Sequence, residues 1–131
     1  MLTAEVTKVQ IGFLEIDGLR SEDGKYYVAV PQIVDLNLIP PNRSKKQLEA
    51  LVGIDFQTHI KLKTKIHPKA INAISLLDFE KVLAKLDRKG VKAAQDLRDE
   101  LVGLSLNQLF ADAFDDKFEK EERQQWLIFR Q

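Results

Sequence analysis

Hydrophobic and polar positions alternate near the start of the chain. Val9, Ile11 and Phe13 occupy one parity, and Leu14 and Ile16 continue the alternation on the other. Alternation with a period of two is typical of a half-buried strand, and a change of parity predicts a β-bulge. We therefore expect strand structure here, with a bulge near Phe13.

A second run of alternating residues covers 26–30. Turn dipeptides at 17–18 and 23–24 precede this run, and both pair aspartate with glycine. The pattern predicts a β-hairpin whose two strands are joined by a long polar connection over residues 18–25.

Two short helices are predicted next. Pro31 suits the first turn of a helix, because its φ is fixed and its missing N–H would have no partner there. Pro40-Pro41 ends that helix. Ser44 is placed to cap a second helix, with Gln47 at the capping-box spacing.

Residues 56–66 alternate without interruption. Apolar residues and threonines share one parity, and the polar parity holds Gln57, His59, Lys61, Lys63 and Lys65. This pattern predicts a half-buried strand with a basic face. Pro68 interrupts the strand, and residues 70–74 are expected to form a returning strand.

Apolar residues at helical spacing dominate the remainder. Ser75 is the predicted N-cap of a helix that ends at Gly90. A second helix is predicted from Val91 to Leu104, and the apolar pattern extends to Phe114.

These elements predict one α+β domain over residues 1–114. We expect a small antiparallel sheet, made of the N-terminal hairpin and the central strands, packed with short helices and a C-terminal helical pair. Residues 115–131 are predicted to be a charged helix and an apolar tail. With 131 residues, of which 44% are apolar, the chain can bury a core.

Composition narrows the classes of function. The chain has no cysteine, which excludes disulfides, thiolate zinc sites and a thiol nucleophile. No apolar run reaches the roughly 20 residues of a membrane span and no secretory signal is visible, so we expect a soluble, cytoplasmic protein without membrane contact. There is no phosphate loop or nucleophile elbow. We therefore predict no cofactor, no small-molecule substrate and no catalytic residue.

The net charge is zero, but the charges are unevenly distributed. Residues 40–70 hold seven basic residues against two acidic ones, whereas residues 112–123 hold six acidic residues against three basic ones. The molecule is therefore expected to be electrically polarised, and the acidic segment is a candidate competitor for the basic one.

The basic segment predicts a nucleic-acid surface. Lysines at alternate positions of a strand lie roughly 6–7 Å apart, close to the separation of successive phosphates on one nucleic-acid strand. The start of the nearby helix, at residues 42–47, would offer free N–H groups to a phosphate, and amide or imidazole side chains could contact bases. A solvated sheet face or a lysine-guarded edge strand is the alternative. The predicted contacts are Asn42, Arg43, Lys45, Lys46, Gln57, His59, Lys61, Lys63 and Lys65.

No metal site is predicted. His59 and His67 are the only histidines, and Asp55 is the one acid close to them in sequence. A magnesium-dependent nuclease would need two acids beside a lysine. Asp55 lacks a second acid, and Asp78 and Glu80 would face different directions on a helix. An enzyme is therefore not expected, and a small magnesium-dependent nuclease stays an alternative.

The C-terminal run Trp126-Leu127-Ile128-Phe129 is strongly apolar. Four consecutive apolar residues require burial, either against the domain or against a second copy. We predict that Trp126, Leu127 and Phe129 form an oligomer interface in a homodimer or higher homo-oligomer.

Several segments between residues 9 and 103 follow a recognisable pattern: Glu15-Ile16-Asp17-Gly18, the strand at 26–30, Asn42-Arg43 before Leu48 and Leu51, residues 73–80, and Ala94, Leu97 and Arg98. Together they resemble the BRO-type N-terminal domain (Bro-N) of phage antirepressors and baculovirus repeated proteins, which is similar in style to KilA-N domains. The resemblance implies DNA binding and regulation of transcription. The chain departs from the family at Tyr27, where the family has a tryptophan-like aromatic.

The leading hypothesis is therefore a DNA-binding domain. It would be a transcriptional or phage-type regulator that contacts phosphates through a basic strand and a helix N-terminus, and it would be nucleoid-associated. A protein-interaction or oligomerisation module without DNA binding is the second hypothesis, ahead of the nuclease.

Overall fold

The structure is a computed structural model in which residues 2–52 and 60–115 are described, apart from the side chain of Lys45. The predicted α+β class is confirmed. The elements follow the order β1 (Ala4–Ile11), β2 (Leu14–Ser21), β3 (Tyr26–Ala29), α1 (Val30–Asp35), the 3₁₀ turn η1 (Pro41–Arg43), α2 (Ser44–Val52), β4 (Ile60–Leu62), β5 (Ile71–Ser75), α3 (Leu76–Arg88), α4 (Lys92–Glu100) and α5 (Leu106–Ala113).

The predicted bulge near Phe13 is a hairpin turn instead. Ile11 pairs with Leu14, so Gly12 and Phe13 form a two-residue loop between β1 and β2. Gly12 has a φ of 59°, as the first loop position of a type II′ turn requires. The parity of apolar residues changes because the chain reverses direction at this point.

The first half of the predicted connection over residues 18–25 is strand, because β2 continues to Ser21. Gly18 lies inside β2, where it pairs with Val28 of β3. A Cβ on Gly18 would lie 2.9 Å from a ring carbon of Phe110, so this glycine allows α5 to approach the sheet closely. The true turn is short, and it places Gly24 at a φ of 82°.

Local helix signals were correct at most boundaries. Pro31 lies in the first turn of α1, and the Ser75 hydroxyl caps α3 by accepting the N–H of Asp78 at 3.1 Å. Three boundaries were wrong. The first predicted helix ends at Asp35, before it reaches Pro40. Ser44 is no N-cap, because η1 runs directly into α2 and Ser44 already has helical φ and ψ. The helix predicted from Val91 to Leu104 ends at Glu100 instead.

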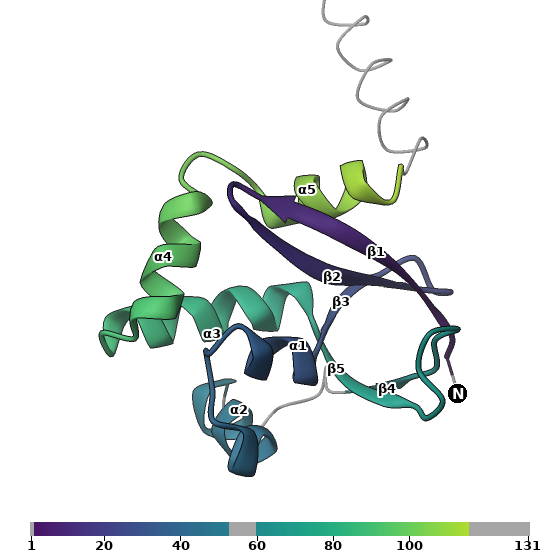
Figure 1. Ribbon diagram of the computed structural model, residues 1–131, viewed down its shortest axis with the longest axis horizontal. Helices are drawn as coiled ribbons and strands as arrows, with labels where there is room; N and C mark the ends of the chain where they lie inside the picture. The colour runs from purple at the N-terminus through teal and green to yellow at the C-terminus, as the bar shows by residue number, and fades with distance from the viewer. Residues whose placement is uncertain (1, 53–59, 116–131) are drawn as a thin grey trace, which may run out of the picture.

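The sheet has the order β1-β2-β3-β5-β4, and every neighbouring pair is antiparallel. Its two edges meet. The Ala4 N–H donates to the Lys63 carbonyl at 2.8 Å, and the Lys63 N–H donates to the Leu2 carbonyl at 3.0 Å. The sheet is therefore curled, so that the start of the chain reaches the segment after β4 (Figure 1).

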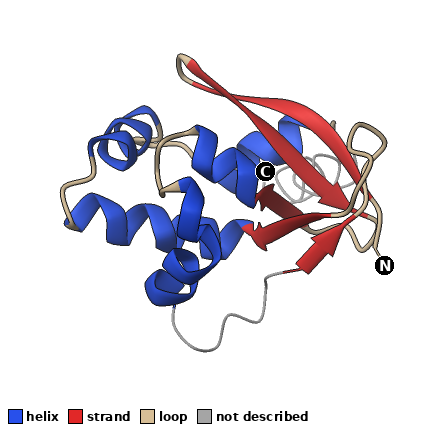
Figure 2. Ribbon diagram, turned by 60° about the horizontal axis from the view of Figure 1, so that its bottom comes forward, coloured by secondary structure: helices blue, strands red, loops and turns tan. Residues whose placement is uncertain are grey.

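Curling separates two apolar cores. The helices gather over one face of the sheet (Figure 2), where Phe79 and Phe110 are fully buried. The inner side of the curl encloses a smaller cluster around Tyr27 and Leu62. Within the described part of the chain, no helix is long and apolar enough to cross a membrane.

Candidate nucleic-acid interface

Strand β4 carries the first of the predicted lysines. Leu62 is fully buried in the inner cluster, so Lys61 and Lys63 on either side of it point outward and are exposed. Lys61 lies opposite Asn72 of β5, whereas Lys63 bridges to Thr3 at the start of the chain. Both lysines therefore have a backbone fixed by strand pairing.

The basic strand is shorter than predicted. β4 ends at Leu62, and Lys65 and Ile66 lie in the bend that follows. Ile66 was expected on the buried parity, but it is 64% exposed. Lys65 is exposed as predicted, although it does not continue the regular spacing of the strand.

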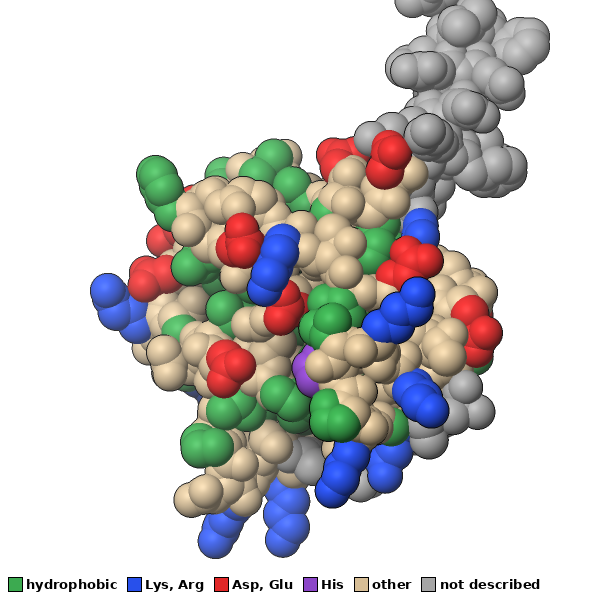
Figure 3. Space-filling view, turned by 45° about the vertical axis from the view of Figure 1, so that its right-hand side comes forward, with side chains coloured by type: hydrophobic (Ala, Val, Ile, Leu, Met, Phe, Trp, Pro, Cys, Tyr) green, Lys and Arg blue, Asp and Glu red, His purple; other side chains and the backbone are tan. Residues whose placement is uncertain are grey.

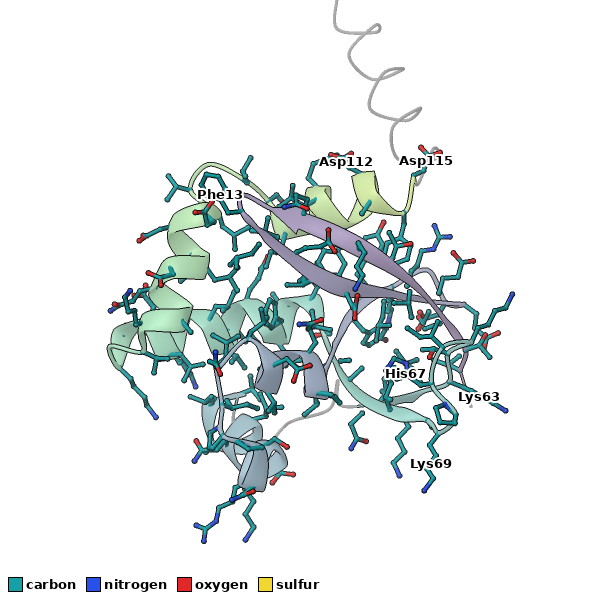
Figure 4. The ribbon with its side chains drawn as sticks, viewed as in Figure 1. Phe13, Lys63, His67, Lys69, Asp112 and Asp115 are labelled. Atoms are coloured by element: carbon teal, nitrogen blue, oxygen red, sulfur yellow. The ribbon has the colours of Figure 1, made fainter. Side chains whose placement is uncertain are left out.

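A hydrogen-bonded turn ends the strand. The Thr64 hydroxyl accepts the backbone N–H of His67 at 3.2 Å, and it lies 2.7 Å from His67 Nδ1. Thr64 is buried, so both of its contacts hold the turn between β4 and β5. Figure 4 shows His67 close to Lys63 and Lys69, on the lower right of the molecule. The turn thus fixes the backbone between exposed lysines.

The second predicted surface begins at η1. Asn42 and Arg43 lie in this 3₁₀ turn and are exposed, and Lys46 and Gln47 are exposed in the first turn of α2. The unbonded N–H groups of the helical segment therefore start after Pro40 rather than after Ser44. Lys45 is in α2, but its side chain is outside the described atoms.

The two surfaces flank one hollow. Pro41 and Ser44 line a hollow of about 430 Å³ on one side, and Ile71 and Asn72 line it on the other. Lys61 is the strand neighbour of Asn72, so it lies beside this hollow. The Asn72 Oδ1 atom is buried without a hydrogen-bond partner among the described residues. In Figure 3, Lys and Arg side chains gather along the lower edge of the molecule.

The cations of the two predicted surfaces lack the ion pairs that several other cations of the chain form. Five cations elsewhere pair with acids: Lys8 with Asp17 (2.5 Å), Arg20 with Glu5 (2.9 Å), Lys81 with Asp78 (4.0 Å), Lys92 with Asp96 (3.7 Å) and Arg98 with Asp87 (2.5 Å). Lys61, Lys63 and Lys65 form no ion pair with a described residue. The same is true of Arg43 and Lys46. These five form what we call the basic rim.

The sequence did not predict a second hollow next to the basic rim. Lys63 and Lys65 line a groove of about 1000 Å³, and Glu5 and Glu22 also line it. Arg20 lies in the same groove, paired with Glu5 and 5.2 Å above the Phe114 ring. The groove exists because the sheet closes at Lys63, a non-local contact that alternation along the chain does not signal.

Several predicted residues lie outside the described part of the chain. These are Gln57 and His59 of the predicted strand, Asp55 of the nuclease alternative, and Trp126, Leu127 and Phe129 of the predicted oligomer interface. The described part of the structure therefore does not test their predicted roles.

The described carboxylates do not form a metal site. Asp78 is buried in the first turn of α3, where it faces Lys81, whereas Glu80 is exposed. Within residues 2–52 and 60–115, no three His, Asp or Glu residues cluster in a way that could hold a metal ion.

Comparisons with known proteins give no family assignment. No family model, no curated protein and no solved structure matches this chain. The resemblance to Bro-N domains therefore stays a prediction based on the residues quoted for it.

Proposed function

We propose that this chain binds DNA through the basic rim. The observation that carries the proposal is that these five exposed cations form no ion pair with a described residue. Arg43 and Lys61 lie next to residues that line one hollow, and Lys63 and Lys65 line the neighbouring groove. A lysine that is already paired must lose that pair before it contacts a phosphate. An unpaired lysine instead gains a phosphate and releases a counterion from the DNA.

The geometry suits contacts to the phosphate backbone. Lys61 and Lys63 project from one strand at alternate positions, about 6–7 Å apart. Arg43 and Lys46 add positive charge on the helical segment whose residues Pro41 and Ser44 line the hollow. Contacts of this kind position a protein on DNA without reading its sequence. In keeping with the Bro-N resemblance, we propose a role in regulating transcription.

Fluorescence anisotropy with labelled DNA tests the proposal. We would compare a random duplex with a random single strand, using the wild-type chain and the double variant Lys61→Gln/Lys63→Gln. Loss of two phosphate contacts is expected to weaken binding at low salt by about 10- to 100-fold. Both replaced side chains are exposed, so the fold should persist.

The matched control is Lys85→Gln/Lys89→Gln at the end of α3. These lysines are exposed and form no ion pair with a described residue, so the change in net charge is the same. The control is expected to retain nearly full affinity. An absence of binding at low salt would contradict the proposal and favour the protein-interaction module. Equal losses in both double variants would assign binding to net charge alone.

A further inference from the structure

Three apolar side chains are exposed at one end of the molecule. Phe13 at the tip of the β1–β2 hairpin is 94% exposed, and Val102 and Leu104 in the α4–α5 connection are 79% and 51% exposed. The hairpin tip packs against α4, because a Cβ on Gly12 would overlap the Glu100 side chain. Figure 4 shows Phe13 beside the α4–α5 connection. We call these three side chains the apolar patch.

A hollow of about 400 Å³ opens beside Val102 and Leu104 of the apolar patch. Its polar lining comes from Glu80 and Arg98, and the apolar lining residues are Leu83, Leu101, Val102, Leu104 and Leu106. Its volume falls within the range of about 300–1,000 Å³ that holds small ligands or a large side chain. An exposed apolar surface with such a hollow is typical of a site that receives an apolar group.

We propose that the apolar patch receives this chain's own apolar tail, residues 126–129, with Trp126 in the hollow. The tail is outside the described residues, and it supplies four consecutive apolar side chains. A tryptophan buries about 150–250 Å² and keeps one N–H donor. The Glu80 carboxylate can accept that N–H, and the Arg98 guanidinium can lie over the indole face.

The intervening chain is long enough for this contact. Leu106, the first residue of α5, lines the hollow, and Asp115 follows shortly after the last residue of α5. The eight residues of α5 span about 12 Å. The segment from Asp115 to Trp126 can extend to about 36 Å. The tail can therefore return along α5 to the hollow.

The size of the patch favours the same chain over a second copy. Stable dimers bury about 1,200 Å² or more in total, which one small hollow and three side chains do not provide. A short tether instead holds the tail at an effective concentration of about millimolar, so a small contact is enough. This inference does not depend on DNA binding.

Trp126 is the only tryptophan, so its fluorescence reports directly on the tail. We would measure the emission maximum and the acrylamide quenching constant of the full chain, with the isolated peptide 116–131 as the reference for an exposed tryptophan. The wild type is expected to emit at shorter wavelength and to be quenched less than the peptide. Val102→Asp/Leu104→Asp is expected to shift both values to those of the peptide.

Leu77→Asp is the matched control, because Leu77 is 62% exposed on α3 and outside the apolar patch. It should leave both values unchanged. Peptide-like values in the wild type would overturn the proposal. Protection of Trp126 from acrylamide that persists in Val102→Asp/Leu104→Asp would also overturn the proposal, because the tail would then dock elsewhere. Shielding that is lost on serial dilution would show that a second copy supplies the contact, which also overturns it.

Discussion

The backbone N–H of Ala4 donates to the carbonyl oxygen of Lys63 at 2.8 Å, and this bond joins the two edges of the sheet. Ala4 begins β1, whereas Lys63 directly follows β4. The orientation of a basic-rim lysine therefore depends on the first residues of the chain. Stability and DNA binding should respond together when this contact is broken.

Ala4→Pro removes the N–H that Lys63 accepts. We expect a loss of about 1–3 kcal/mol in the free energy of unfolding, because a carbonyl and a strand edge lose their partner, together with weaker DNA binding. Urea denaturation measures the first effect. By alternation from the Ile11–Leu14 pair, the N–H of Lys8 also faces away from β2, so Lys8→Pro is the control. Equal losses of stability in the two variants would show that edge closure contributes nothing.

Ser75→Ala removes the hydroxyl that caps α3. Ser75 Oγ accepts the N–H of Asp78 at 3.1 Å, and N-caps of this type contribute about 0.5–2 kcal/mol. We expect a loss in that range in the free energy of unfolding. Ser75→Thr keeps the hydroxyl and should retain most of the stability. If Ala and Thr reduce it equally, the hydrogen bond is not the cause.

Gly18→Ala should be destabilising because the side chains of Val9 and Phe110 already fill the space beside Gly18. The added Cβ would lie 2.6 Å from Val9 Cγ2 and 2.9 Å from Phe110 Cε2, and overpacking of this kind costs about 1–3 kcal/mol. Phe110→Leu should relieve part of this cost when the two changes are combined, as a double-mutant cycle can measure. Gly24→Ala is the control, because a Cβ on Gly24 meets no atom within 4 Å. Its loss of stability comes from the positive φ alone, so the losses from Gly24→Ala and Phe110→Leu should add. Additivity in both cycles would refute the packing argument.

Tyr27 should make stability fall at alkaline pH. Burial raises the pKa of the Tyr27 phenol above its ordinary value of 10.0, and the charge of Asp23 acts in the same direction. The folded state therefore favours the neutral phenol. The stabilisation is complete below the unfolded pKa and is lost as pH rises through the folded pKa.

Chemical denaturation at several pH values from about 9 to 11 measures this effect. Tyr27→Phe should flatten the pH dependence of the free energy of unfolding. The hydrogen bond and charge of Asp17 raise the pKa of Lys8, which adds a contribution of the same sign. The chain with Tyr27 and the Tyr27→Phe variant should therefore both be measured with Lys8→Gln, which removes the contribution of Lys8. Identical pH dependence with and without the Tyr27 hydroxyl would contradict the prediction.

Local signals account for what the sequence predicted correctly. The cap at Ser75 and the proline at the start of α1 act within a few residues, so they are visible in the sequence alone. Alternation around Leu62 likewise predicted that Lys61 and Lys63 face outward, because side chains next to a buried strand residue point to the opposite face of the sheet.

The errors arose where two structures produce the same local pattern. A bulge and a two-residue turn both change the parity of apolar positions, and only pairing of Ile11 with Leu14 distinguishes them. Ser44 has the composition of an N-cap, but Pro41 starts a 3₁₀ turn before it. Closure of the sheet at Lys63 joins residues far apart in the sequence, so neither the groove nor the position of Arg20 in it was predictable.

The salt dependence of DNA affinity tests the basic rim most directly. Each phosphate that is neutralised contributes about −0.9 to the slope of log K against log salt concentration on a duplex. Lys61→Gln/Lys63→Gln should therefore reduce the magnitude of this slope by about two relative to the wild type, whereas Lys85→Gln/Lys89→Gln should leave it unchanged. A slope that is the same in the wild type and in Lys61→Gln/Lys63→Gln would contradict DNA binding through the basic rim.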